Sequence, residues 1–131
     1  MPLDARAQEV EDWLARAAQD LRAAQVDLEA EPPLDADAAF HCQQAVEKAL
    51  KALLARYDEP FRKTHDIGEL ALACLVLEPS LEALLRESAP LTEYAWRFRY
   101  PGEAFEPDPE EVVAALDLAR RVVGEVTSRI G

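Results

Sequence analysis

One helix-length segment, residues 36–57, constrains the fold of this chain more than any other. At about 100° per residue, apolar side chains cover most of its circumference, and its polar residues fall in a row at three- and four-residue spacing. The row consists of His41, Gln44, Lys48 and Lys51, with Glu47 at its border. A helix that is apolar on several sides must be buried on several sides, so we expect it to lie inside a helical bundle.

The rest of the chain also has helical spacing. From Asp4, which we expect to be an N-cap, apolar residues recur at steps of four and three as far as Leu28, and the opposite face is charged. Pro32 and Pro33 then end the helix. A third helix is expected over 67–77, capped by Thr64 or Asp66.

A fourth helix is expected over 81–98, kinked or divided at Pro90, and a fifth begins with Asp108 as N-cap and Pro109 in its first turn. No alternating strand pattern, internal repeat or glycine-rich loop interrupts the sequence. We therefore predict an all-α fold, an antiparallel up-and-down bundle of four to five helices that forms a single domain over residues 1–131.

Composition and the N-terminal residues indicate a cytoplasmic protein. The longest apolar run, 70–77, is far shorter than the roughly 20 residues that cross a membrane. The charged N-terminal segment does not resemble a secretory signal, so we expect no membrane association. Cys42 and Cys74 are isolated within apolar helical patterns, which predicts buried, reduced thiols.

The charge distribution is uneven. The net charge is −12, from 26 acidic and 14 basic residues, and this opposes non-specific attraction to nucleic acid or anionic lipid. Residues 41–65 and 92–101, however, hold seven basic residues against four acidic ones. The chain is an acidic body with one locally basic region, which leaves nucleic-acid binding open.

Candidate ligand-binding residues lie in that basic region. Lys48 and Lys51 offer ammonium groups to phosphate, and Gln44 offers an amide to a base or sugar edge. The alternative is a solvated stripe in which Glu47 pairs with Lys51 at i, i+4 spacing. His65 stands at an expected helix start, which favours anions, although it is equally able to pack and cap its own loop.

Arg97, Arg99 and Tyr100 complete the candidate ligand site. Arginine near a helix C-terminus is explained by the helix dipole alone. Arg97 and Arg99 nevertheless point to different faces, so one of them could turn toward the bundle and require an anionic partner. Tyr100 could stack on a base or simply pack.

The sequence carries no familiar catalytic or metal-binding motif. It has no glycine-rich phosphate loop, no Cys-x-x-Cys and no His-Glu-x-x-His. His41 and Cys42 are adjacent in a helix and therefore point about 100° apart. We predict no catalytic residues, no metal site and no cofactor.

Three separated segments together resemble the HEPN domain (higher eukaryotes and prokaryotes nucleotide-binding). They are 40–53, Phe-His-Cys-Gln-Gln-Ala-Val-Glu-Lys-Ala-Leu-Lys-Ala-Leu, then 64–67, Thr-His-Asp-Ile, and 99–101, Arg-Tyr-Pro. The resemblance implies a helical bundle that forms a homodimer or higher homo-oligomer. It also implies a nucleotide ligand, or a non-catalytic role as the partner of a minimal nucleotidyltransferase.

Some HEPN proteins are RNases that use an arginine followed four to six residues later by histidine. Here no histidine follows Arg97 or Arg99. Two alternatives to the non-catalytic module stay open. One is an RNase toxin of a toxin-antitoxin pair with a non-standard site formed by His65 and Arg99, and the other is a purely structural oligomerisation module.

Overall fold

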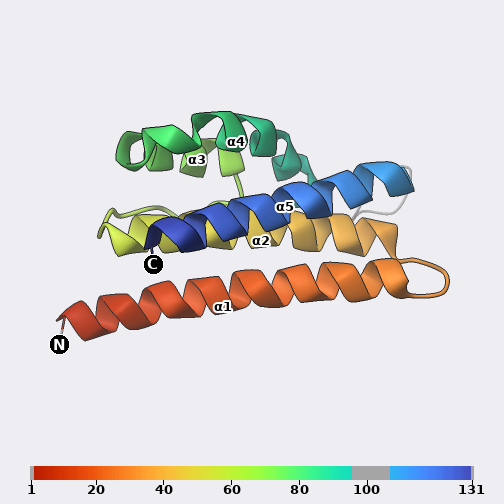
Figure 1. Cartoon of the computed structure of the whole chain (residues 1–131), viewed down its shortest axis with the longest axis horizontal. Coiled ribbons are helices and arrows are strands. Elements are labelled where there is room, and N and C mark those ends of the chain that lie inside the picture. The colour runs from red at the N-terminus through yellow and green to blue at the C-terminus, as the bar shows by residue number, and fades with distance from the viewer. Residues whose placement is uncertain (1, 96–106, 131) are drawn as a thin grey trace.

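Helices lie side by side along the length of the molecule (Figure 1). The computed structural model describes residues 2–95 and 107–130. Within these ranges it contains no strand, which confirms the predicted all-α class. The elements are α1 (Pro2–Glu29), α2 (Asp35–Arg56), α3 (Ile67–Leu77), the 3-10 helix η1 (Pro79–Leu81), α4 (Glu82–Ser88), the 3-10 helix η2 (Ala89–Ala95) and α5 (Pro109–Ile130).

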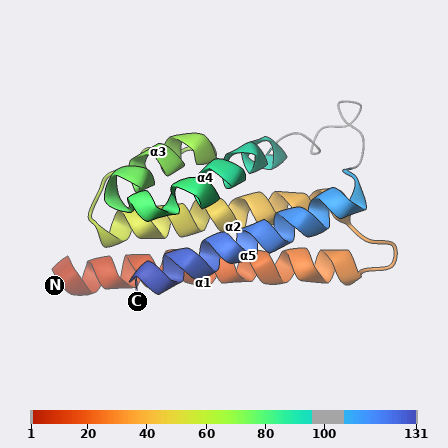
Figure 2. The same cartoon turned by 45° about the horizontal axis from the view of Figure 1, so that its top comes forward.

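Helix α2 is the central element, as its apolar circumference predicts. Fifteen of its 22 residues are buried, and it contacts α1, α3, η2 and α5. In both views α1 covers one side of α2, while α3 and α4 lie on the other (Figures 1 and 2). α1 is antiparallel to α2, and α5 runs in the direction of α2 because the α3–η2 region brings the chain back.

The helix ends follow the predicted signals with one exception. Asp66 caps α3 by accepting a hydrogen bond from the Glu69 backbone N–H at 3.3 Å. Asp108 accepts one from the Glu110 N–H at 3.2 Å where α5 begins. The predicted start at Asp4 is wrong, because α1 already begins at Pro2, and proline is well suited to the first turn of a helix.

The predicted fourth helix is divided, as its internal proline requires. α4 ends at Ser88, and the following 3-10 helix contains Pro90. Leu81, Leu85, Leu91 and Tyr94 from this region reach the core, as the spacing predicts. The part of the predicted helix beyond residue 95 lies outside the described residues.

The core is made mainly of aliphatic side chains from α2, α3 and α5. It includes both cysteines, which are free and fully buried. Burial raises the pKa of each thiol to about 12, so both stay protonated at neutral pH. Among the described helices, none is both long enough and apolar enough to span a membrane.

Candidate functional site

Glu47 lies at the centre of the polar row on α2, and four side chains hydrogen-bond to it. Its own side chain is only 3% exposed. Its Oε1 accepts from His65 Nδ1 at 2.7 Å, from Gln43 Nε2 at 3.1 Å and from Gln44 Nε2 at 3.4 Å. Its Oε2 accepts from Lys51 Nζ at 2.8 Å. We call these five residues the Glu47 network.

The carboxyl group of Glu47 is charged despite its burial. Burial raises its pKa, but hydrogen bonds from Lys51, His65 and Gln43 together lower it more, and the resulting pKa lies below the ordinary value of 4.5. Glu47 is therefore ionised at neutral pH. Because an ionised carboxylate only accepts hydrogen bonds, His65 Nδ1 must donate.

The network also attaches the loop before α3 to the central helix. Besides its contact with Glu47, Gln43 Nε2 donates to the backbone carbonyl of His65 at 3.0 Å. The His65 side chain itself is 69% exposed. Its Nδ1 is thus held by a buried carboxylate, while Nε2 has no hydrogen-bond partner among the described residues. A histidine that acts as a general acid or base is commonly oriented like this, with a carboxylate on one ring nitrogen and the other nitrogen open.

Lys51 is buried against two aromatic rings. Its Nζ lies 5.4 Å from the ring centroid of Trp13 and 6.0 Å from that of Phe61, distances typical of cation–π contacts. The two rings meet edge to face, with centroids 6.2 Å apart. A hollow of about 590 Å³ opens beside them, lined by Glu9, Trp13, Lys51, Ala55, Asp58, Glu59, Pro60, Phe61 and Lys63.

A second polar group joins α1 to α2. Asp20 of α1 is 7% exposed. Its Oδ1 lies 2.8 Å from His41 Nδ1, and its Oδ2 accepts a hydrogen bond from Lys48 Nζ at 2.6 Å. Lys48 and His41 therefore pair with a carboxylate of α1 and not with Glu47. We call Asp20, His41 and Lys48 the Asp20 group.

Two further carboxylates lie close to the other nitrogen of His41. Asp37 Oδ2 is 3.4 Å from His41 Nε2, and ligand atoms of Asp27, Asp37 and His41 all lie within 4.8 Å of one another. Burial, followed by the hydrogen bond and charge of Asp37, raises the pKa of Asp27 from 3.8 to about 6, and the charge of His41 only partly offsets this. We call these three residues the Asp27 cluster.

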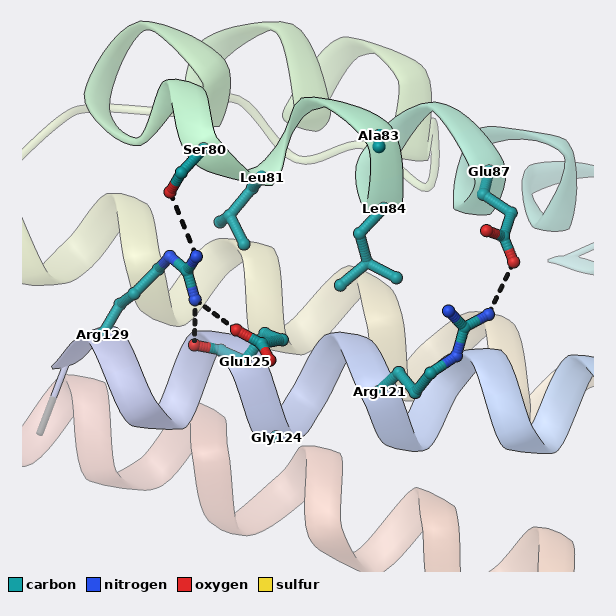
Figure 3. A pocket seen from close by; sticks show the side chains of 9 residues that line it. All are labelled: Ser80, Leu81, Ala83, Leu84, Glu87, Arg121, Gly124, Glu125 and Arg129. Carbon is teal, nitrogen blue, oxygen red and sulfur yellow. Dashed lines mark hydrogen bonds and ion pairs between the residues drawn. The ribbon is translucent and has the colours of Figure 1, made fainter.

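A separate hollow of about 450 Å³ lies between α4 and α5 (Figure 3). Its two arginines already have partners in this chain. Arg121 binds Glu87 at 2.6 Å, and Arg129 binds Ser80 at 3.0 Å as well as Glu125. In Figure 3 the contacts of Arg121 with Glu87 and of Arg129 with Ser80 cross the hollow, so they tie α4 and η1 to α5, whereas the contact with Glu125 lies within α5.

The predicted ligand residues separate into three sets. Gln44, Lys51 and His65 converge on Glu47, whereas Lys48 belongs to the Asp20 group. Arg97, Arg99 and Tyr100 lie outside the described residues. The pairing of Glu47 with Lys51 expected for a solvated stripe is present, but both side chains are buried rather than solvated.

Two buried polar residues of α1 were not singled out from the sequence. They are Asp20 and Asp27, which are 7% and 8% exposed. A signal was present in the sequence. The two aspartates stand seven residues apart, each three positions after an alanine of the apolar stripe, and this spacing keeps them beside the helix contact.

Comparison with known proteins agrees with this architecture. The family model of the HEPN domain matches residues 10–129. The chain belongs to the HEPN domain family. Among solved structures, the crystal structure of ST0689, an archaeal HEPN homologue, superposes with a TM-score of 0.71 at 26% sequence identity. The alignment covers 93% of this chain and 98% of that one. No curated protein gives a significant match.

The sequence segment that resembles the HEPN domain most specifically lies on the central helix α2. In this HEPN domain, the Gln-Gln-x-x-Glu-x-x-x-Lys part of the motif forms the Glu47 network and attaches the histidine-bearing loop to α2. The motif therefore holds an exposed imidazole in place and sets a buried lysine in the wall of the aromatic hollow.

Proposed function

We propose that this chain is a non-catalytic HEPN module that binds a protein partner of the minimal nucleotidyltransferase class. The observation that carries the proposal is an exposed apolar face on α3. Leu72 is 70% exposed and Val76 is 81% exposed, although they lie on an 11-residue helix with a buried inner side. Leu72 and Val76 are one helical turn apart and therefore share a face, and large exposed apolar side chains that lie together are typical of a protein interface.

A groove of about 530 Å³ extends this surface toward α4. Leu72, Leu75 and Leu85 line it, and Asp66, Glu69 and Arg86 contribute charged groups. An apolar centre with charged residues around it is the usual composition of an interface between folded proteins. The motif lysines on the central helix are by contrast occupied by carboxylates of the same chain.

The test first establishes whether a neighbouring reading frame encodes a minimal nucleotidyltransferase, then mixes that protein with the purified chain and measures mass by light scattering. We expect a stable complex with the wild type and a loss of at least tenfold in affinity for Val76→Asp. Val113→Asp is the matched control, because Val113 is 59% exposed on α5. The mass of the chain alone tests the predicted homodimer. Equal affinities for both variants and the wild type would refute the α3 surface.

A nucleotide ligand is a second candidate, favoured by the hollow beside Lys51. Trp13 and Phe61 offer ring surfaces to a base, and Lys63 offers an ammonium group to phosphate. Calorimetric titration with ATP should then show binding, and Lys63→Ala should weaken it. Lys48→Ala and Arg99→Ala test two further residues that the sequence predicts to bind the ligand. Absence of heat at millimolar nucleotide would exclude this ligand.

The geometry of His65 gives the RNase alternative one specific observation in its favour. A buried glutamate holds Nδ1 and the ring is largely exposed, as a general acid or base requires. Incubating the protein with RNA decides between the two functions. Our proposal predicts intact RNA, whereas cleavage that His65→Ala abolishes would establish an RNase.

A further inference from the structure

The Asp27 cluster brings two carboxylates together with a single imidazole. Asp27 is buried to more than nine-tenths of its surface, and its Oδ2 has no hydrogen-bond partner within residues 2–95 and 107–130. A second carboxylate, Asp37, lies beside it in the cluster. A buried anion beside another anion is costly unless a cation joins them.

The side chains in the cluster are those that bind a divalent transition metal. Two carboxylates and one imidazole form a mixed oxygen and nitrogen donor set, which suits Zn²⁺ and its neighbours in the first transition row. One ligand atom from each residue lies within 4.8 Å of the other two. Ligand atoms about 2.0–2.2 Å from a common Zn²⁺ ion lie closer to one another than that, so only a small side-chain rotation closes the site.

His41 is already oriented as a metal ligand. Its Nδ1 is 2.8 Å from Oδ1 of Asp20, and its Nε2 faces Asp37 across 3.4 Å. When Nδ1 donates to Asp20, the lone pair of Nε2 points into the cluster. A carboxylate that holds the outer nitrogen of a histidine in this way is the usual neighbour of a metal-bound imidazole. Lys48 neutralises the second oxygen of Asp20.

We propose that Asp27, Asp37 and His41 bind one divalent transition-metal ion, such as Zn²⁺, at the end of the α1–α2 pair. The ion would cross-link the two helices near the turn that joins them, because Asp27 comes from α1 and the other two ligands come from α2. This differs from the expectation from sequence, which considered His41 only together with Cys42. The proposal does not depend on the partner or the ligand proposed above.

Calorimetric titration of the untagged, chelator-treated chain with Zn²⁺ tests the site. We expect one ion per chain, a rise in melting temperature with Zn²⁺, and visible absorption bands of bound Co²⁺ that report its coordination geometry. Asp37→Asn should weaken binding at least tenfold. It is the primary variant because Asp37 is half exposed, so the fold tolerates the change. Asp27→Asn and His41→Gln should abolish binding.

Asp117→Asn is the matched control, because Asp117 is an exposed aspartate on α5 that pairs with Arg121 at 3.5 Å. It should bind Zn²⁺ as the wild type does. The alternative is a metal-free cluster in which protonated His41 bridges Asp20 and Asp37. Absence of saturable Zn²⁺ binding, or binding that both Asp37→Asn and Asp27→Asn retain in full, would overturn the metal site in favour of that alternative.

Discussion

The two buried carboxylates Glu47 and Asp27 lie in opposite environments within the same bundle. Glu47 receives hydrogen bonds from four side chains, including an ammonium group, and its pKa is lowered. Asp27 faces a second carboxylate, keeps one oxygen unpartnered, and its pKa is raised. A polar network that is fully satisfied stabilises the fold, whereas an unsatisfied one costs stability until something binds to it.

The largest expected effect follows from removing the charge at the centre of the Glu47 network. Glu47→Gln leaves the Lys51 ammonium buried without its carboxylate, so we expect the free energy of unfolding to fall by about 3–5 kcal/mol. Chemical denaturation followed by circular dichroism measures this. The control is Glu82→Gln, because its pair with Arg86 is exposed and should change stability by less than about 1 kcal/mol.

Removing the charge of Asp27 should change the free energy of unfolding in the opposite direction. Asp27→Asn removes a charge that the fold disfavours, so the metal-free protein should become more stable at neutral pH, by up to about 2–3 kcal/mol given roughly 1.4 kcal/mol per pKa unit. The same denaturation assay in the presence of chelator measures it. A loss of stability instead would show that the Asp27 carboxylate is compensated in the folded chain.

The pH dependence of the free energy of unfolding should also distinguish Asp27 from Glu47. Because the pKa of Asp27 is raised from 3.8 to about 6, the folded state binds more protons between these values, and the Asp27 contribution to stability falls as pH rises through this window. Glu47 has a lowered pKa, so its contribution is present above pH 4.5 and is lost on acidification. Unfolding curves of the wild type, Asp27→Asn and Glu47→Gln against pH should show the two opposite trends.

A smaller effect is expected for Lys48. It pairs with Asp20 at 2.6 Å, but its side chain is 20% exposed and Asp20 keeps the contact with His41. Lys48→Ala should therefore lower the free energy of unfolding by about 1–2 kcal/mol. Arg62→Ala is the control, since its pair with Glu69 is largely exposed and should contribute less than about 1 kcal/mol. Equal losses for both lysine and arginine variants would contradict a structural role for the Asp20 group.

The fold could be predicted from sequence because its signals are local. Helical spacing identified the buried circumference of α2, and the caps at Asp66 and Asp108 follow from side chains a few residues from the helix starts. Pro90 located the division between α4 and η2. Each of these signals is contained within one or two helical turns.

The polar groups could not be predicted in the same way, because their partners come from distant parts of the chain. Asp20 and Lys48 are 28 positions apart, and Glu47 and His65 are 18 apart. Which residues of α1 face α2 depends on the rotation of each helix about its axis, and a small rotation moves an aspartate between the helix contact and solvent. Periodicity alone does not determine that rotation.

The most direct test is to titrate the carboxyl carbons of Asp27 and Glu47 by NMR in the metal-free protein. Our account predicts a pKa of about 6 for Asp27 and a pKa below 4.5 for Glu47. Addition of Zn²⁺ should then remove the Asp27 titration and leave that of Glu47 unchanged. If both groups titrate at the ordinary values of exposed carboxyls, with or without Zn²⁺, the contrast between a satisfied and an unsatisfied network is wrong.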